Sequence, residues 1–154
     1  MKVILPGSYD PITLGHLAII RRASRVFDEV YVVVFINPDK KYTFSVDERV
    51  EMISLAVKEL DNVTVDSFPG FVIDYMREKG IDKIVKGYRN QKDLEYEKKQ
   101  ADYNLKNGGY ETELWKCDCA LEGISSTAAR TAIANGKDLS AFLSPEVAEF
   151  IKNH

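Results

Sequence analysis

The chain has 154 residues, of which 45% are hydrophobic and 29% charged, the composition of an ordinary globular domain large enough to bury its own core. The net charge of −3 excludes the general positive field of a nucleic-acid-binding protein, so we expect no nucleic-acid partner. A local basic cluster that binds phosphates is still compatible with this net charge. The two cysteines, Cys117 and Cys119, have a C-x-C spacing that favours reduced thiols over a zinc site or a disulfide.

The first residues and the apolar runs bear on location. Met1 to Leu5 is followed at once by proline and glycine, so the apolar segment of a signal peptide is lacking. No run approaches the ~18 apolar residues of a membrane helix. We therefore expect a cytoplasmic protein without a membrane partner.

In chain order, short apolar runs alternate with helical patterns. Residues 3–5 predict the first strand, and apolar residues spaced along 17–27 predict a helix. Residues 31–36 are continuously apolar, as in a strand of a parallel sheet with both faces covered. The S-x-x-E pattern of residues 45–48 is a capping box and predicts a helix that runs through Val57.

The second half of the chain continues this alternation. We expect strands at residues 63–65, 81–85 and 110–116. Helices are expected at residues 70–80, 90–107, 125–135 and 145–151, with glycines after the first three and a proline in the first turn of the last. The alternation predicts an α/β fold: a single doubly wound, Rossmann-like domain over residues 1–154, with a five-stranded parallel sheet flanked by helices.

In such folds, ligands bind beyond the carboxyl ends of the strands, where the order of the chain reverses. Four stretches that combine turn residues with phosphate-compatible side chains fall there, at residues 7–16, 37–44, 86–89 and 123–130. Their convergence predicts a site for a phosphorylated ligand. The chain has no Walker lysine motif and no G-x-G-x-x-G pattern, so the usual kinase and dinucleotide signatures are lacking.

The first stretch, GSYDPITLGH, joins a glycine, a hydroxyl, an Asp-Pro turn and a histidine at a helix start. Free amides at a helix start favour phosphate, and His16 could donate a hydrogen bond to a phosphoryl oxygen. The same residues also suit an ordinary strand-turn-helix connection with a surface histidine. We expect Asp10 to fix the turn and leave it outside the catalytic set.

Positive charge marks the next two stretches. Lys40 and Lys41 follow the most apolar strand, which suits an anionic ligand, although paired surface lysines are common. Lys86 and Arg89 bracket Gly87 after the fourth strand, and the glycine permits close approach of a ligand.

Hydroxyls mark the last stretch. Residues 125–127 place three of them at a helix start, where a single one would serve as an ordinary cap, and Arg130 follows in the first turns. Residues 93–100, in contrast, have the pattern of a solvated helix face, from which Glu97 could turn toward a ribose or a neighbouring subunit.

Two motifs carry a family resemblance. GSYDPITLGH resembles the G-x-[FY]-D-P-x-x-x-G-H signature of the HxGH nucleotidyltransferases, and ISSTAAR resembles their second signature, I-S-S-T-x-x-R. Thr13 stands where nicotinamide mononucleotide adenylyltransferases and cytidylyltransferases usually carry histidine, and threonine is typical of the phosphopantetheine adenylyltransferases. The segments NPDKKYTFSVDERVEM, KGYRNQKDLEYE and FLSP extend the similarity over essentially the whole chain.

The resemblance implies that the protein catalyses the penultimate step of coenzyme A synthesis. AMP would pass from ATP to 4′-phosphopantetheine, giving dephospho-CoA and pyrophosphate, by direct in-line attack without a covalent intermediate. Mg²⁺ is the expected cofactor, carried by the triphosphate and not by protein side chains. The implied assembly is a homohexamer, a dimer of trimers, and coenzyme A is an expected feedback ligand.

The resemblance also implies roles for individual residues. The catalytic set is His16, Lys40 and Arg89. The expected ATP contacts are Ser8, Tyr9, His16, Gly87, Tyr88, Arg89, Glu97, Ser125, Ser126, Thr127 and Arg130. The expected phosphopantetheine contacts are Ser8, Lys40, Val72 and Lys86.

The chain departs from the family pattern at two positions. Lys86 replaces an arginine and keeps its charge, but it loses the bidentate geometry of a guanidinium. Tyr88 replaces a frequent leucine beside the adenine. Two alternative functions stay open: another nucleotidyltransferase with a nicotinamide mononucleotide, glycerol phosphate or sugar phosphate acceptor, and a non-catalytic nucleotide-binding module.

Overall fold

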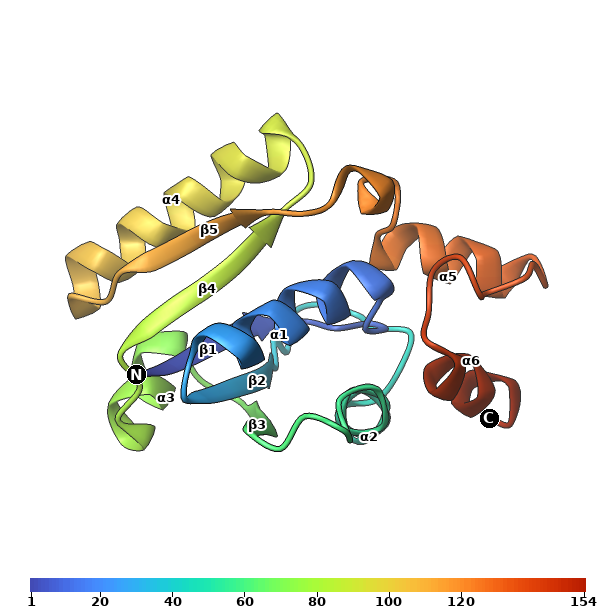
Figure 1. The fold of residues 1–154 in the computed structure, drawn as a ribbon, viewed down its shortest axis with the longest axis horizontal. Helices are drawn as coiled ribbons and strands as arrows, with labels where there is room; N and C mark the ends of the chain where they lie inside the picture. Colours follow the sequence, from blue (N-terminus) through green and yellow to red (C-terminus); the bar gives the residue numbers. More distant parts are fainter.

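A single parallel sheet forms the centre of the molecule. The structure, a computed structural model, describes residues 1–154, apart from the side chain of Cys119. The strands lie in the order β3-β2-β1-β4-β5 (Figure 1), which confirms the predicted Rossmann-like sheet. Their bounds are β1 (Lys2–Gly7), β2 (Glu29–Phe35), β3 (Val63–Phe68), β4 (Lys83–Tyr88) and β5 (Thr112–Lys116).

The helices fall where the sequence places them, because their end signals are local. The Ser45 capping box starts the second helix, and Gly80 and Gly109 end the third and fourth in the left-handed conformation. A short 3₁₀ helix, η1 (Cys119–Leu121), was not predicted, because three residues carry no periodicity. The α-helices are α1 (Leu14–Val26), α2 (Val46–Ala56), α3 (Val72–Lys79), α4 (Gln91–Gly108), α5 (Ser126–Ala134) and α6 (Pro145–Lys152).

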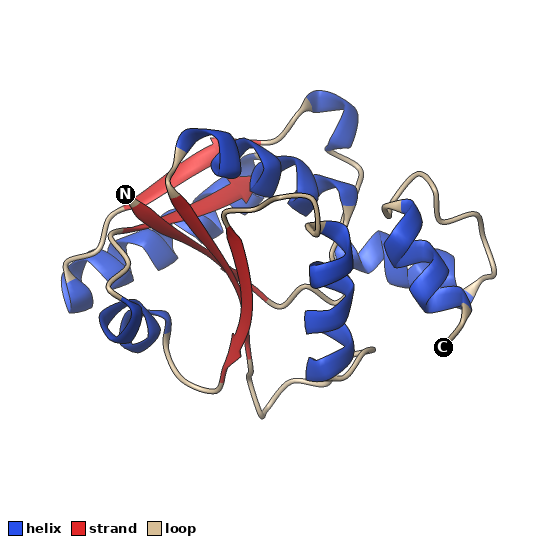
Figure 2. Ribbon diagram, turned by 60° about the horizontal axis from the view of Figure 1, so that its bottom comes forward, coloured by secondary structure: helices blue, strands red, loops and turns tan.

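Helices cover both faces of the sheet (Figure 2). Side chains alternate along β1, so Val3 and Leu5 enter one core, which α1, α2 and α6 complete. Ile4 enters a second core on the opposite face, where Tyr75 and Met76 of α3 pack against it. The helix layers on both faces confirm the doubly wound architecture.

The sheet opens between β1 and β4. β1 pairs with β2 over six residues, whereas it pairs with β4 only at Val3–Lys83 and Ile4–Ile84. Beyond those two pairs the strands separate, so their carboxyl ends flank a gap at the place where strand order reverses.

The prediction that residues 86–89 follow the fourth strand is wrong for three of them. Lys86, Gly87 and Tyr88 belong to β4 itself, because they pair with Leu114, Trp115 and Lys116 of β5. The strand therefore carries these residues directly along the gap, with only Arg89 in the connection to α4.

The two cysteines follow β5. Cys117 is a buried, free thiol whose pKa is raised, chiefly by burial. The expectation of reduced thiols stays a prediction, because the side chain of Cys119 lies outside those that the structure describes.

Candidate active site

Three cavities meet at Ser8, just beyond β1. The large cavity, of about 770 Å³, extends between β1, β4, α3 and α4 and reaches Lys40 and Lys86. The histidine cavity, of about 400 Å³, contains His16. The lysine cavity, of about 370 Å³, is lined by Ser8, Asp10, Lys40, Lys41, Tyr42, Thr43, Ser126, Thr127 and Arg130.

The structure distributes the predicted site residues among these cavities. Val72 and Lys86 line the large cavity, and Lys40 borders both the large and the lysine cavities. Arg130 lines the lysine cavity and is not among the residues that line the histidine cavity. The histidine cavity is lined by the predicted ATP contacts Ser8, Tyr9, His16, Gly87, Tyr88, Arg89, Glu97, Ser125, Ser126 and Thr127.

Tyr9 is held in an unusual backbone conformation. Its φ of 48° lies in the left-handed region, and its hydroxyl donates to the Leu5 carbonyl at 2.8 Å. The ring packs edge-on against His16, with 4.9 Å between the ring centroids. A Cβ at Gly7 would lie 3.0 Å from the Tyr9 ring, so this glycine makes room for the tyrosine as well as for a ligand.

His16 is fixed in one orientation by Thr13. The Thr13 backbone N–H donates to His16 Nδ1 at 3.0 Å, and Thr13 Oγ1 lies 3.1 Å from the same atom. Because Nδ1 accepts a hydrogen bond, the proton of the neutral ring is on Nε2, which is then a donor. Thr13 is buried and caps α1, so the residue that suggested the acceptor substrate in the sequence also orients the histidine.

The charge state of His16 follows from its surroundings. Burial lowers the pKa of His16 from its ordinary value of 6.5 to about 4, and the positive charges of Lys86 and Arg89 contribute. The imidazole is therefore neutral at physiological pH, and the histidine cavity receives a hydrogen-bond donor that carries no charge of its own.

We expect His16 to stay neutral from pH 8 to pH 5. An NMR titration of ring-labelled histidine, with His16→Gln identifying the signal, should show no protonation of His16 in that range; a midpoint near 6.5 would contradict the structure. The unfolded chain binds a proton at this histidine near pH 6.5. The folded chain binds it only near pH 4. His16 should therefore lower the stability of the fold progressively as the pH falls from about 6.5 to about 4.

Asp10 ties two site segments together. Its carboxylate accepts hydrogen bonds from the Thr43 amide at 2.8 Å and the Phe44 amide at 2.9 Å. The Arg130 guanidinium donates to its backbone carbonyl at 2.9 Å. Asp10 thus has a structural role, as expected, but it holds the segment after Lys40 and not only its own turn.

Sequence reasoning missed Arg49, which completes this attachment. Arg49 is 1% exposed and donates to the Ser8 carbonyl at 2.9 Å and the Phe44 carbonyl at 3.1 Å. Its guanidinium also lies 4.0 Å from the centre of the Tyr42 ring. One signal was available: Arg49 occupies the same helical stripe as Met52, Ile53 and Ala56, all of which are buried.

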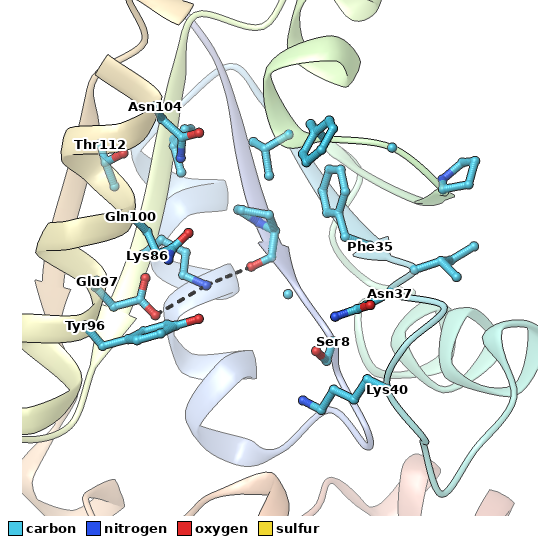
Figure 3. Close-up of a pocket in the computed structure, with 18 of the residues that line it drawn as sticks. Ser8, Phe35, Asn37, Lys40, Lys86, Tyr96, Glu97, Gln100, Asn104 and Thr112 are labelled. Carbon is cyan, nitrogen blue, oxygen red and sulfur yellow. Dashed lines mark hydrogen bonds and ion pairs between the residues drawn. The ribbon is translucent and has the colours of Figure 1, made fainter. Parts of the chain in front are cut away.

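Lys86 of β4 and Glu97 of α4 form an ion pair beside the gap in the sheet. Lys86 Nζ lies 3.6 Å from Glu97 and donates to the Pro6 carbonyl at 3.1 Å. Burial raises the pKa of Glu97, and Lys86 opposes that shift. Figure 3 shows this pair on one side of the large cavity, with Ser8 and Lys40 on the other. Residues 93–100 are therefore not only a solvated face, because Glu97 points inward.

Asp93 is a second residue that the sequence reasoning left on the solvated face. Its carboxylate binds the Arg89 guanidinium, with Nε–Oδ2 at 2.9 Å and Nη2–Oδ1 at 3.4 Å. The i,i+4 spacing of these opposite charges was the available signal. Asp93 orients Arg89 at the edge of the histidine cavity.

The hydroxyls at the start of α5 are mostly structural. Ser125 caps the helix by accepting from the Ala128 amide at 3.0 Å, and Ser126 donates to the Pro11 carbonyl at 2.9 Å. The amides of Ser126 and Thr127 have no acceptor within the helix, and both residues line the histidine and the lysine cavities. These two backbone amides are therefore free to donate to an anion in either cavity.

The described side chains do not form a metal centre. Among them, no group of three or more histidine, cysteine, aspartate or glutamate residues is arranged to hold a metal ion. Asp10, the carboxylate in the lysine cavity, already accepts two backbone N–H groups.

The comparisons with known proteins first give the class. Residues 4–132 match the family model described as cytidylyltransferase-like. A solved structure assigned as a nicotinate-nucleotide adenylyltransferase from Vibrio parahaemolyticus shares the fold, with a TM-score of 0.74 and 19% identity over 99% of this chain and 91% of that chain. The chain therefore belongs to the cytidylyltransferase-like family and has the fold of this nucleotidyltransferase structure.

Curated relatives narrow the assignment. A phosphopantetheine adenylyltransferase of Clostridium tetani is 44% identical over 96% of this chain and 93% of its own length. One from Corynebacterium diphtheriae is 43% identical over 97% of this chain and 95% of its own. One from Clostridium novyi is 46% identical over 86% of this chain and 83% of its own length. The chain belongs to the phosphopantetheine adenylyltransferase family. No helix in the described part of the chain is long and apolar enough to cross a bilayer.

Proposed function

We infer that the protein transfers AMP from ATP to 4′-phosphopantetheine, giving dephospho-CoA and pyrophosphate. The relatives of the same name support the reaction. The observation that carries it in the structure is the position of Ser8, which borders the large, the histidine and the lysine cavities. The reacting phosphorus of ATP would lie at that junction.

The large cavity suits a phosphorylated pantetheine. Lys40 and Lys86 supply positive charge near its inner end, beside Ser8. The rest of the lining combines polar with apolar side chains, which suits the amides and methylenes of the arm. Thr112 contributes a buried hydroxyl that has no hydrogen-bond partner among the described residues. The residues that would contact the arm are Phe35, Val72, Ile84, Gln100, Asn104 and Thr112.

The start of α3 also favours this ligand. Phe71, the N-cap residue, makes no side-chain hydrogen bond to the helix. The Val72 amide, at the first position of α3, has no acceptor within the helix and can donate to an external one, such as an amide carbonyl of the arm. This supports the predicted backbone contact of Val72.

The histidine cavity suits the adenosine and phosphates of ATP. Gly87 and Tyr88 line it along β4, and a Cβ at Gly87 would lie 3.0 Å from Ile19, so the strand stays close to α1. Arg89 and the first amides of α5 lie where they can bind the triphosphate.

In the proposed mechanism, a phosphate oxygen of phosphopantetheine attacks the α-phosphorus of ATP. The bond from the α-phosphorus to the bridging oxygen breaks, and that oxygen leaves with pyrophosphate and keeps the electron pair. A phosphate monoester is largely ionised near pH 7, since its second pKa is about 6, so no general base is needed. His16 donates from Nε2 to the oxygens that gain charge, and Lys40 orients the nucleophile.

Mg²⁺ is proposed to arrive on the triphosphate of ATP. The described side chains offer it no ready-made set of ligands, so the phosphate oxygens and water would coordinate it. When bound, Mg²⁺ neutralises part of the phosphate charge.

Pyrophosphate release tests the function. The purified protein should release pyrophosphate from ATP in the presence of 4′-phosphopantetheine and should not do so with nicotinamide mononucleotide. Activity with nicotinamide mononucleotide alone would assign a different acceptor. ATP binding without turnover of either substrate would favour the non-catalytic module.

Assembly, feedback and location are proposed from the family resemblance. α4 contains no buried residue, and Phe71, Tyr103 and Leu105 are each more than half exposed, which suits a homohexamer that covers these side chains. Coenzyme A contains the pantetheine arm, so it would compete for the large cavity. A cytoplasmic location fits a biosynthetic enzyme.

A further inference from the structure

One aromatic side chain lies beside the place where the proposed substrates meet. Six residues line both the large and the histidine cavities: Pro6, Gly7, Ser8, Lys86, Tyr96 and Glu97. Five of them are partly buried, whereas Tyr96 is 61% exposed. Neither the catalytic set nor the expected substrate contacts include Tyr96, although it belongs to the wall that the two cavities share.

The position of Tyr96 follows from the helix that carries it. Tyr96 directly precedes Glu97 on α4, and the Glu97 carboxylate turns inward to Lys86 at 3.6 Å. In Figure 3 the Tyr96 side chain extends from α4 beside this pair, toward the side of the large cavity where Ser8 and Lys40 lie. Because Tyr96 is also the most exposed residue of the shared wall, its ring lies on the solvent side of the junction at Ser8.

The Tyr96 side chain is also free to move. The hydroxyls of Tyr9 and Tyr75 donate within the protein, at 2.8 Å and 3.0 Å, but that of Tyr96 has no such partner among the described residues. Within the same described part, the Tyr96 ring packs on no other aromatic ring and lies under no cationic side chain. Single exposed tyrosines are common, but this one can bury its ring by folding over a ligand in either cavity.

Water competes with phosphopantetheine for the α-phosphorus of ATP. If a water oxygen attacks, the bond from the α-phosphorus to the bridging oxygen breaks, and that oxygen leaves with its electron pair. AMP and pyrophosphate form, while one proton of the water passes to pyrophosphate and the other to the solvent. A donor such as His16 Nε2 assists both reactions, because it acts on the same α-phosphate oxygens. The choice of acceptor therefore depends on which molecule reaches the phosphorus.

We propose that Tyr96 determines the choice of phosphopantetheine over water as the acceptor. Its ring covers the junction at Ser8 once ATP is bound and keeps water from the α-phosphorus. This rests on the proposed function. Because Tyr96 lines both cavities, one side chain can close over the nucleotide and over the end of the large cavity from which the nucleophile comes. A tyrosine suits this place, since its apolar ring excludes water while its hydroxyl stays hydrated.

The test measures the two products that ATP can give. Each protein is incubated with ATP, Mg²⁺ and 4′-phosphopantetheine, and AMP and dephospho-CoA are separated by chromatography. We expect Tyr96→Ala to raise the ratio of AMP to dephospho-CoA about tenfold, a change of about 1.4 kcal/mol between the two barriers. Tyr96→Phe keeps the ring and should stay within about twofold of the wild type. The matched control is Lys99→Ala, which removes a long, exposed side chain of α4 that is not among those lining the three cavities, and it should also stay within about twofold.

Release of ATP gives a second readout, which does not need phosphopantetheine. A ring that covers the junction also covers the nucleotide, so a fluorescent ATP analogue should leave Tyr96→Ala about tenfold faster than it leaves the wild type or Tyr96→Phe. Stopped-flow displacement with excess ATP measures these rates. Because Tyr96 is exposed, its replacement should leave the fold intact.

The two readouts separate this inference from the proposed function. If the wild type formed dephospho-CoA and Tyr96→Ala had an unchanged product ratio, the inference would be overturned while the function stood. If the wild type bound ATP but formed no dephospho-CoA, the function would fail, and the release rates alone would decide whether Tyr96 covers the site. An equal rise of AMP in Tyr96→Phe would overturn the role of the ring in favour of the hydroxyl. An equal rise in Lys99→Ala would overturn it too, because a general disturbance of α4 would explain the effect.

Discussion

Replacing His16 with alanine should lower kcat about 10²–10³-fold, the usual loss for one donor to a developing oxyanion. The KM for ATP should change much less, because the neutral Nε2–H meets its strongest acceptor only when charge gathers on the α-phosphate oxygens in the transition state. Steady-state kinetics of pyrophosphate release would measure both values.

Two variants sharpen the test of His16. Glutamine at this position carries an uncharged N–H donor, so His16→Gln should retain more activity than His16→Ala if donation, and not positive charge, is what the site needs. The matched control is His154→Ala, since the chain has only two histidines and His154 stacks on Phe150 at the far end of α6. If the variant bound ATP more weakly but kept its kcat, His16 would contribute to ground-state binding of ATP instead.

Replacing Arg49 with methionine should destabilise the protein by about 3 kcal/mol, since hydrogen bonds to charged groups contribute about 1.5–3 kcal/mol each. The substitution keeps a long apolar side chain but leaves the carbonyls of Ser8 and Phe44 without their donor. Urea unfolding, followed by circular dichroism, measures the change in the free energy of unfolding.

Arg25→Met is the matched surface control, because Arg25 is exposed on α1; it should stay within about 0.5 kcal/mol of the wild type. Arg49→Lys keeps the charge and loses the guanidinium plane that faces Tyr42, so its loss should be intermediate. If Arg49→Met unfolded with wild-type stability, the attachment of the Lys40 segment would rest on Asp10 alone.

The fold was largely predictable because its signals are local. The Ser45–Glu48 capping box and the glycines at 80 and 109 act within a few residues, and the continuous apolar run of β2 needs no distant partner to be recognised. The gap between β1 and β4 was not predictable. Nothing in the sequence indicates that Lys86 belongs to β4, or that its ammonium group donates to the Pro6 carbonyl across the gap.

The site was predicted at the level of which stretches meet, but not how they are held. Asp10 contacts residues 33 and 34 positions away, and Arg130 reaches Asp10 across 120 positions. A single sequence does not carry such pairings. Arg49 was missed for the same reason, because its partner Ser8 lies 41 positions away. Asp93, in contrast, pairs with Arg89 at an i,i+4 spacing, a local signal that the sequence carries.

The short pairing of β1 with β4 has an energetic consequence. Only two residue pairs join the two halves of the sheet, β3-β2-β1 and β4-β5, so backbone pairing is sparsest along the line beside the large and histidine cavities. A molecule bound between Ser8 and Lys86 would contact both halves of the sheet, where few backbone hydrogen bonds join them. Under the proposed function, substrate binding and the rigidity of the sheet are therefore coupled, because bound substrates would add contacts between two halves that few backbone pairs join.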